Sequence, residues 1–262
     1  MNLSQTINYN EYSMAKVYGE TIIEIDRVNK SFGENHVLQN YTLNIRKGEN
    51  VVVLGKSGCG KSVLIKCVAG LLRYDSGSIK VFGNEIASLS HKTLDELRVK
   101  IGFVFQSSAL YDSMTVKENL EFPFRRHRKN KSDKEIVEIV IDTLNNVGLI
   151  HAIDLMPSEL SGGMRKRVGL ARALMLNPDI MLYDEPTTGL DPITSKEISN
   201  LMLKMQQKYN TSSIIISHDM HCAQLTANRL SVMHNGINYA EGSFDQMKSN
   251  TDPVVHAFFE LI

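Results

Sequence analysis

The sequence predicts an α/β fold, and three observations lead to that prediction. Residues 51–54 are all apolar, as in a strand that is buried on both faces of a sheet. A Gly-rich loop at residues 55–62 follows this run directly, and a helical pattern then continues to Leu72. Two further apolar runs, at residues 180–183 and 214–216, lead into polar residues, which is typical of buried strands that reach the edge of a sheet.

Length and composition narrow the class of protein. The 262 residues suffice for one α/β domain with an insertion, or for two closely joined domains. Basic and acidic residues number 29 each, and this zero net charge argues against a nucleic-acid partner. Cys59, Cys67 and Cys222 lack metal-ligand spacing and no signal peptide precedes them, so we expect a reducing cytosol. No apolar run reaches the roughly 18 residues needed to cross a bilayer, so we expect any membrane association to be peripheral.

The chain is predicted to consist of an extension, one main domain and a tail. Residues 1–20 lack apolar periodicity and are interpreted as an N-terminal extension. The main domain, residues 21–250, opens with two strands, one around Ile23 and Ile25 and one at residues 37–45. Residues 251–262 form an apolar C-terminal tail, which we expect to pack on this protein or on another one.

Helix signals and charge dominate after Gln106, and we expect an inserted helical subdomain at about residues 107–165. Ser132 and Glu135 have the spacing of a capping box. The residues that then recur on one helical face are Ile136, Val140, Leu144 and Val147. These signals predict a helix that starts after Ser132.

Two signals mark element boundaries in the second half of the chain. Asp191 followed by Pro192 predicts the N-cap and first residue of a helix. Asn235 and Gly236, between two strand-like runs, predict a hairpin turn.

The Gly-rich loop has the composition of a phosphate-binding loop. Its glycines let backbone N–H groups approach a polyphosphate, and the positive end of the following helix adds to the attraction. We expect Lys61 to reach the β- and γ-phosphates and the Ser62 hydroxyl to bind Mg²⁺. The residues of this loop expected to bind the nucleotide are Gly55, Lys56, Ser57, Gly58, Cys59, Gly60, Lys61 and Ser62.

Polar side chains follow the other predicted strands at the carboxyl edge of the sheet, where α/β proteins bind ligands. We expect Asp184 to complete the magnesium shell. Glu185 cannot point the same way along an extended strand, so it is assigned to orient or deprotonate the attacking water. His218 is interpreted as a γ-phosphate sensor that holds Glu185 and this water in register. The Gln106 amide is expected to touch magnesium. Taken alone, the Asp-Glu pair would more often be a solvated turn and a single histidine would more often be structural, whereas a capping or loop amide is an equal alternative for Gln106.

A second phosphate-binding segment lies far along the chain from the first. Ser161 is placed to N-cap a helix, and Gly162 and Gly163 expose backbone N–H groups at its positive end. Taken alone, this pattern would more often be an ordinary N-cap. Because two such segments cannot hold the same end of one nucleotide, we expect ATP to lie between two copies of the chain.

Together these residues resemble the ATP-binding cassette (ABC) family, from about residue 21 to residue 244. The motifs stand in the order of the family, namely Walker A at residues 55–62, the Q-loop at Gln106, the signature at residues 160–163, Walker B at residues 180–184, the catalytic Glu185, the D-loop at Leu190-Asp191 and the switch residue His218. Phe32 falls where the family has an aromatic residue that stacks on adenine. The resemblance implies a P-loop NTPase fold of the ABC type, with a mixed core sheet, an antiparallel β subdomain and an inserted helical subdomain. It also implies that the chain binds ATP and Mg²⁺ and hydrolyses ATP.

Residues 160–174 are similar to the Mla-type lipid-transport ATPases, as are residues 60–64 and 105–113. The similarity implies an ATPase subunit that moves phospholipid between membranes from the cytoplasmic face of the inner membrane. Its partners would be a second copy of itself, an MlaE-like permease, an MCE-domain lipid carrier and a STAS-domain regulator. One position departs from the family pattern, since Met164 stands where Gln is usual, which removes a polar group that could reach the ribose of the opposing ATP.

Other functions of a cassette ATPase stay open. Within transport, the chain could serve a small-solute importer or a cell-division complex. From another class, it could be a soluble scaffold without any permease, acting in Fe–S assembly or DNA repair. The zero net charge argues against DNA repair.

Overall fold

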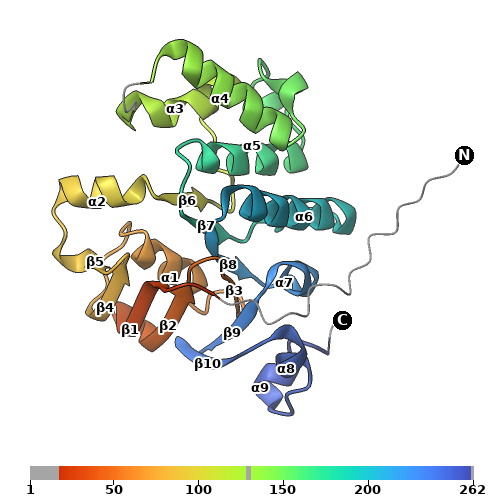
Figure 1. Cartoon of the computed structure of the whole chain (residues 1–262). Coiled ribbons are helices and arrows are strands. Elements are labelled where there is room, and N and C mark those ends of the chain that lie inside the picture. Colours follow the sequence, from red (N-terminus) through yellow and green to blue (C-terminus); the bar gives the residue numbers. More distant parts are fainter. Residues whose placement is uncertain (1–17, 128–130, 261–262) are drawn as a thin grey trace, which may run out of the picture.

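A computed structural model describes residues 18–127 and 131–260 of the chain. The predicted extension at residues 1–20 lies outside the described residues except for residues 18–20, and Leu261 and Ile262 of the predicted tail also lie outside them. Figure 1 shows two sheets at the centre and lower part of the molecule, with helices α3 and α4 at the opposite end.

A six-stranded mixed sheet forms the core, in the order β10-β9-β3-β8-β7-β6. Its strands are β3 (Asn50–Leu54), β6 (Ile101–Val104), β7 (Ile180–Asp184), β8 (Ser212–Ser217), β9 (Arg229–His234) and β10 (Ile237–Gly242). All neighbours run parallel except β10, which pairs antiparallel with β9. Strands β3, β7 and β8 are buried at every position, as their continuous apolar character predicts.

The turn between β9 and β10 packs against the second sheet. Asn235 and Gly236 both have positive φ, 48° and 74°, which confirms the predicted hairpin turn. The Gln39 backbone N–H donates to the Gly236 carbonyl oxygen at 2.9 Å. A Cβ atom on Gly236 would lie 2.6 Å from the Val37 carbonyl oxygen, so this contact tolerates only glycine.

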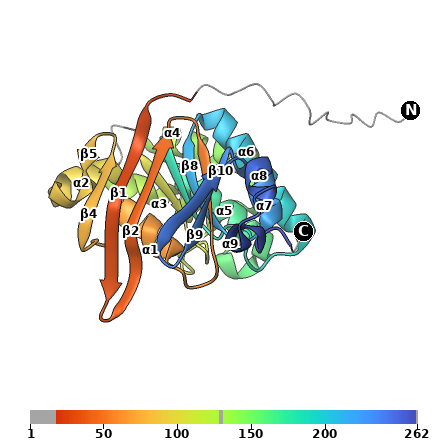
Figure 2. The same cartoon turned by 90° about the horizontal axis from the view of Figure 1, so that it is seen from below.

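The second sheet is antiparallel, in the order β2-β1-β4-β5. Its strands are β1 (Thr21–Phe32), β2 (Asn35–Arg46), β4 (Ser76–Val81) and β5 (Asn84–Glu85). Its apolar face and one face of the core sheet enclose α1 (Lys61–Val68) in a single hydrophobic cluster. Figure 2 shows this sheet on one side of β9 and β10, with α6, α7 and α8 on the other side. Helix α1 ends earlier than the predicted Leu72, and α2 (His91–Arg98) lies at the outer edge of this layer.

The segment between β6 and β7 is helical. It contains α3 (Val116–His127), α4 (Asp133–Asn146), two short 3₁₀ helices (Ile150–Ala152 and Pro157–Glu159) and α5 (Gly162–Leu174). Ser132 and Glu135 form the predicted capping box at the start of α4. The four apolar residues predicted to share one face of this helix are buried and pack against α3 and α5. These helices thus have a hydrophobic cluster of their own.

The remaining α-helices cover the other face of the core sheet. They are α6 (Pro192–Tyr209), α7 (Met220–Thr226), α8 (Phe244–Lys248) and α9 (Pro253–His256). The Asp191 carboxylate accepts from the backbone N–H groups of Ile193 and Thr194, which confirms it as the N-cap of α6. Val255 and Phe259 are buried, and the Phe259 ring meets that of Phe244 edge-on at 5.5 Å. The described part of the C-terminal tail therefore packs on this protein, and no helix within the described ranges is both long and apolar enough to span a bilayer.

Truncating the core of the helical segment should destabilise the protein. Leu144 is fully buried in α4, so Leu144→Ala leaves a cavity and should lower the free energy of unfolding by about 3 kcal/mol. Ile141 on the same helix is 38% exposed, and Ile141→Ala should cost about 1 kcal/mol or less. Urea denaturation followed by circular dichroism measures both values. Equal losses for the two variants would contradict this account of the packing.

Candidate functional site

A cleft of about 600 Å³ opens at the carboxyl edge of the core sheet. Four of the segments that line it follow the parallel strands β3, β6, β7 and β8, and a fifth comes from the antiparallel sheet. Its lining residues are Phe32, Val37, Ser57, Gly58, Gly60, Lys61, Ser62, Val63, Gln106, Glu185, Thr188 and His218. Parallel strands thus bring together polar residues that are far apart in the sequence.

The loop between β3 and α1 is closely packed. Gly58 and Gly60 have positive φ, 77° and 108°. A Cβ atom on Gly55 would lie 2.5 Å from the Cys59 Sγ, and one on Gly60 would lie 2.8 Å from the Val37 carbonyl oxygen. Lys56 and Ser57 are exposed, whereas Cys59 is half-buried, and burial raises the pKa of its thiol. This geometry suits a loop whose backbone N–H groups surround an anion.

Lys61 lies inside this loop at the start of α1. Its Nζ atom donates to the carbonyl oxygens of Gly55 and Lys56 at 2.7 and 3.0 Å. The same atom lies 3.7 Å from the Glu185 Oε1 atom. The ammonium group is therefore nearly buried and stands where a phosphate group held by the loop would meet it.

Ser62 and Asp184 form the polar pair on which the predicted magnesium site rests. The Ser62 hydroxyl donates to the Asp184 carboxylate at 2.6 Å, and Asp184 is buried at the end of β7. Hydroxyl and carboxylate oxygens suit Mg²⁺, which usually binds through one or two carboxylates together with substrate phosphates. Accordingly, the described residues contain no cluster of three or more His, Cys, Asp or Glu that would hold a metal by itself. Gln106 is exposed and lines the same cleft, and its role toward magnesium stays a prediction.

Asp184 and Glu185 point in different directions, but the predicted reason is wrong. Strand alternation requires Glu185 to lie in the strand, whereas β7 ends at Asp184 and Glu185 has φ 50°, in the left-handed region. This turn takes the Glu185 carboxylate toward Lys61 while Asp184 contacts Ser62. A glutamate in this conformation costs on the order of 1 kcal/mol and persists only where its surroundings hold it.

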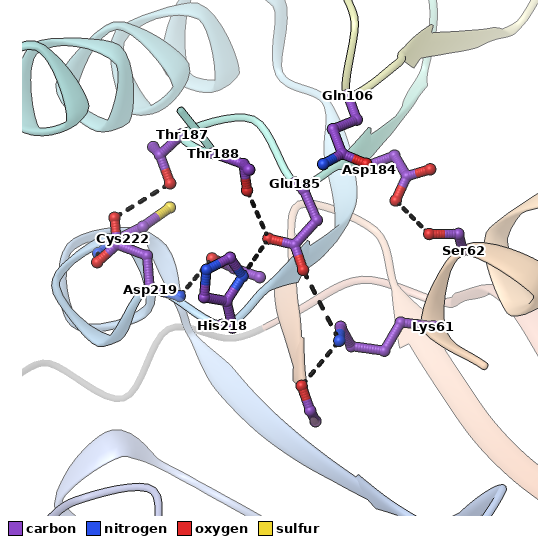
Figure 3. Close-up of polar contacts among 12 residues, drawn as sticks. Lys61, Ser62, Gln106, Asp184, Glu185, Thr187, Thr188, His218, Asp219 and Cys222 are labelled. Atoms are coloured by element: carbon purple, nitrogen blue, oxygen red, sulfur yellow. Dashed lines mark hydrogen bonds and ion pairs between the residues drawn. The ribbon is translucent and has the colours of Figure 1, made fainter. Parts of the chain in front are cut away.

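The Glu185 carboxylate has fixed partners (Figure 3). The His218 Nδ1 atom lies 2.8 Å from Oε2, and the Thr188 hydroxyl donates to the same oxygen at 3.1 Å. The residue after the histidine, Asp219, caps α7 and accepts from the Thr187 hydroxyl at 3.0 Å, which ties the two loops together. A carboxylate held in this way is suited to orient a water molecule or to accept its proton.

The signature residues lie elsewhere. The Ser161 hydroxyl accepts from the Met164 backbone N–H at 3.2 Å, which confirms Ser161 as the N-cap of α5. None of Ser161, Gly162 and Gly163 lines the cleft in the part of the chain that the structure describes. A Cβ atom on Gly163 would lie 2.7 Å from the Thr194 side chain, so this segment borders the start of α6 instead. Within one copy of the chain, the cleft therefore contains the first predicted phosphate-binding segment, at residues 55–62, but not the second.

Phe32 lies at the open end of the cleft. Its side chain is 50% exposed at the end of β1, and the Lys30 Nζ atom stands 5.2 Å from its ring centroid. Phe32 is therefore not a core residue, and its predicted stacking on adenine stays a prediction.

Sequence reasoning missed two residues that hold the site together, Thr188 and Lys166. The Lys166 Nζ atom donates to the carbonyl oxygens of Gln106 at 2.6 Å and of Glu185 at 3.2 Å. Burial lowers the pKa of this ammonium, and the nearby Glu185 and Asp184 carboxylates oppose that shift. One signal in the sequence could have indicated that Lys166 is buried. Lys166 stands three residues before Gly169, and both lie on the buried face of α5.

Comparison with known proteins finds ATP-binding proteins of transport systems. The model of the "ABC transporter" family matches residues 38–188. The probable ribonucleotide transport ATP-binding protein mkl of Mycobacterium leprae is 39% identical, over 90% of this chain and 68% of the relative. The intermembrane phospholipid transport system ATP-binding protein MlaF of Haemophilus influenzae is 36% identical, over 92% and 91%. The methionine import ATP-binding protein MetN of Campylobacter jejuni is 37% identical, over 86% and 72%.

A solved structure with the same fold is a dimer. It is the post-hydrolysis state of the ATP-binding cassette MJ0796 bound to ADP and Pi. It is 31% identical to this chain, with a TM-score of 0.78, over 85% of this chain and 98% of that one.

Removing the imidazole of His218 should impair catalysis rather than binding. His218 contacts Glu185, so His218→Ala should lower kcat for ATP hydrolysis by about 100-fold and leave the affinity for ATP nearly unchanged. His221 is exposed on the neighbouring helix α7, and His221→Ala serves as the matched control. Steady-state kinetics and titration with a fluorescent ATP analogue measure the two quantities. A kcat for His218→Ala equal to that of the control would remove His218 from its predicted role.

Proposed function

Because this chain belongs to the ABC transporter family, we propose that it is the ATP-hydrolysing subunit of a membrane transporter that moves phospholipid between membranes. The fold predicted from the sequence is confirmed, with a mixed core sheet, an antiparallel sheet and an inserted set of helices. As an ABC ATPase the chain binds and hydrolyses ATP, and ATPases of this family dimerise and pair with membrane permeases.

The proposed working unit is a dimer with two composite ATP sites. The observation that carries this proposal is the separation of Ser161, Gly162 and Gly163 from the cleft that contains Lys61 and Glu185. A second copy, turned to face the first, would place its α5 N-terminus against ATP held by the first copy's loop. The dimeric structure of the ABC cassette MJ0796 supports such an arrangement.

Each residue of the composite site has a proposed task. The loop of residues 55–62 binds the phosphates, and the Lys61 ammonium neutralises their charge. Ser62, Asp184 and Gln106 would hold magnesium, which supplies further charge neutralisation on the β- and γ-phosphates when bound. Glu185 orients or deprotonates the attacking water.

The other parts of the composite site bind the nucleotide or fix the catalytic base. His218 holds the Glu185 carboxylate in place, Phe32 stacks on the adenine, and the opposing Ser161 segment binds the γ-phosphate. Loss of the γ-phosphate on hydrolysis removes the bridge between the two copies and lets them separate.

The proposal of phospholipid as the substrate rests on the similarity to MlaF, which extends over nearly the whole of both chains. The alignment with MlaF covers 92% of this chain and 91% of MlaF, whereas the alignment with MetN covers 72% of that relative. We propose that the chain lies at the cytoplasmic face of the inner membrane, beneath an MlaE-like permease. An MCE-domain lipid carrier and a STAS-domain regulator would complete the assembly. The second candidate, an importer of a small solute, is favoured by the similarity to MetN, which is named for methionine import, and to mkl, which is named for ribonucleotide transport.

Neutralising the catalytic base should trap the dimer. Glu185→Gln keeps the size of the side chain and one oxygen that can accept from the Thr188 hydroxyl, but it has no carboxylate to accept the proton of water. We therefore expect ATP binding to be retained. ATP hydrolysis should fall by at least about 100-fold, and a stable dimer should form with ATP and Mg²⁺. Light scattering after size-exclusion chromatography measures the dimer, and Glu138→Gln on the exposed face of α4 is the control. Hydrolysis by Glu185→Gln at the parental rate would refute the role of Glu185.

The transported substrate can be identified from the intact assembly. The tagged chain is purified in detergent from membranes, its partners are identified by mass spectrometry, and the complex is placed in lipid nanodiscs. We expect an integral-membrane subunit with bound phospholipid, and ATP hydrolysis that responds to the phospholipid supplied but not to methionine or ribonucleotides. Stimulation by a polar solute would favour the importer. Recovery of the chain without any membrane subunit would favour a soluble scaffold.

A further inference from the structure

Lys166 is a buried cation that joins three parts of the molecule. It lies on α5 with only 8% of its surface exposed. Its Nζ atom donates to the carbonyl oxygens of Gln106, after β6, and of Glu185, after β7. Both acceptors are backbone atoms, so the contacts fix the path of the chain at these two residues.

The Glu185 backbone is held from both sides. Its N–H group donates to the Ile216 carbonyl oxygen of β8 at 3.0 Å, and its carbonyl oxygen accepts from Lys166 at 3.2 Å. The left-handed conformation of Glu185 is costly and needs such constraints to persist. Lys166 therefore helps to set where the Glu185 side chain leaves the backbone.

Helix α5 is hydrogen-bonded to the segment that follows Gln106 and packs closely against it. The Arg172 guanidinium donates to the carbonyl oxygens of Ala109 at 2.8 Å and Ser108 at 3.1 Å. A Cβ atom on Gly169 would lie 3.0 Å from the Ser108 side chain. Lys166, Gly169 and Arg172 are spaced three residues apart, so one face of α5 contacts Gln106 and the residues after it over nearly two turns.

The same helix carries the signature residues at its other end. Ser161 caps α5, and Lys166 follows five residues later, about 7.5 Å along the helix axis. A displacement of the capped end by contact with a nucleotide would move Lys166 as well, because a single helical segment joins them.

We propose that Lys166 is a positioning residue for Glu185, through which α5 couples the nucleotide bound by its own N-terminus to the base of its own cleft. The inference rests on the proposed composite site, in which the N-terminus of α5 contacts the ATP of the partner copy. In the closed dimer, ATP in one cleft then sets the place of Glu185 in the other. Such a route makes hydrolysis in each cleft depend on occupancy of its neighbour.

Heterodimers test whether Lys166 acts on its own cleft or on the neighbouring one. Two differently tagged versions of the chain are combined and purified through both tags in the presence of ATP. The reference pairs a Glu185→Gln copy with an unchanged copy, so only the unchanged copy's Glu185 is active. In the first arrangement, Lys166→Met is added to the copy with the active Glu185. In the second arrangement, Lys166→Met is added to the copy that already carries Glu185→Gln.

We expect the first arrangement to hydrolyse ATP at least about 10-fold more slowly than the reference, because the active Glu185 has lost its own Lys166. The second arrangement should match the reference, since its active Glu185 keeps its lysine. Lys166→Arg in the first arrangement should restore most of the rate because it keeps the charge and the donors. Lys196→Met, at an exposed position of α6, should have no effect in either arrangement.

Two further measurements separate positioning from damage to the fold. Lys166→Met should keep its affinity for ATP, because the structure gives Lys166 no bond to the loop at residues 55–62, and should unfold cooperatively. If it does not fold, Lys166→Gln replaces it, and the same contrast between arrangements is expected with a smaller loss.

Equal losses in the two arrangements, a loss in the second alone or no loss in either would overturn the inference while leaving the composite site intact. Failure of the unchanged and Glu185→Gln chains to pair with ATP would instead overturn the composite site, and the inference with it.

Discussion

The parallel hydrogen-bond ladder of β3, β8, β7 and β6 is the constraint on which the site depends. It brings the ends of these strands to one edge, so that the loop after β3 meets the residues that follow the other three strands. The ladder is stabilised by complete burial of β3, β7 and β8. Polar groups buried at the ends of these strands would cost free energy if they lacked hydrogen-bond partners. Here they bond to one another, as Ser62 does to Asp184.

Features encoded within a few neighbouring residues could be predicted from the sequence. The capping box at Ser132, the N-caps at Ser161 and Asp191, and the hairpin turn at Asn235 depend on local hydrogen bonds and backbone preferences. It was also predictable that Lys61, Glu185 and His218 lie close together. Each follows a strand that the sequence indicates, and the carboxyl ends of parallel strands meet at one edge of the sheet.

Features that depend on packing between distant segments could not be predicted in this way. The two bonds of Lys166 require α5 to lie across the loops after β6 and β7, which no spacing within α5 reveals. The conformation of Glu185 was missed because alternation holds only while a strand continues, and β7 stops one residue earlier. The roles of Phe32, Gln106 and the signature residues toward nucleotide stay predictions, since they concern contacts with molecules outside this single chain.

Two glycines that are far apart in the sequence, Gly60 and Gly236, pack against the Val37 carbonyl oxygen. A methyl group on Gly60 of the phosphate-binding loop would lie 2.8 Å from this oxygen, and one on Gly236 of the hairpin would lie 2.6 Å from it. The hairpin and the loop thus both pack closely against the backbone of β2 at Val37. A side chain at position 236 would displace the Val37 peptide group, against which Gly60 of the loop also packs. Sequence changes in this hairpin are therefore under the same steric restriction as changes in the loop.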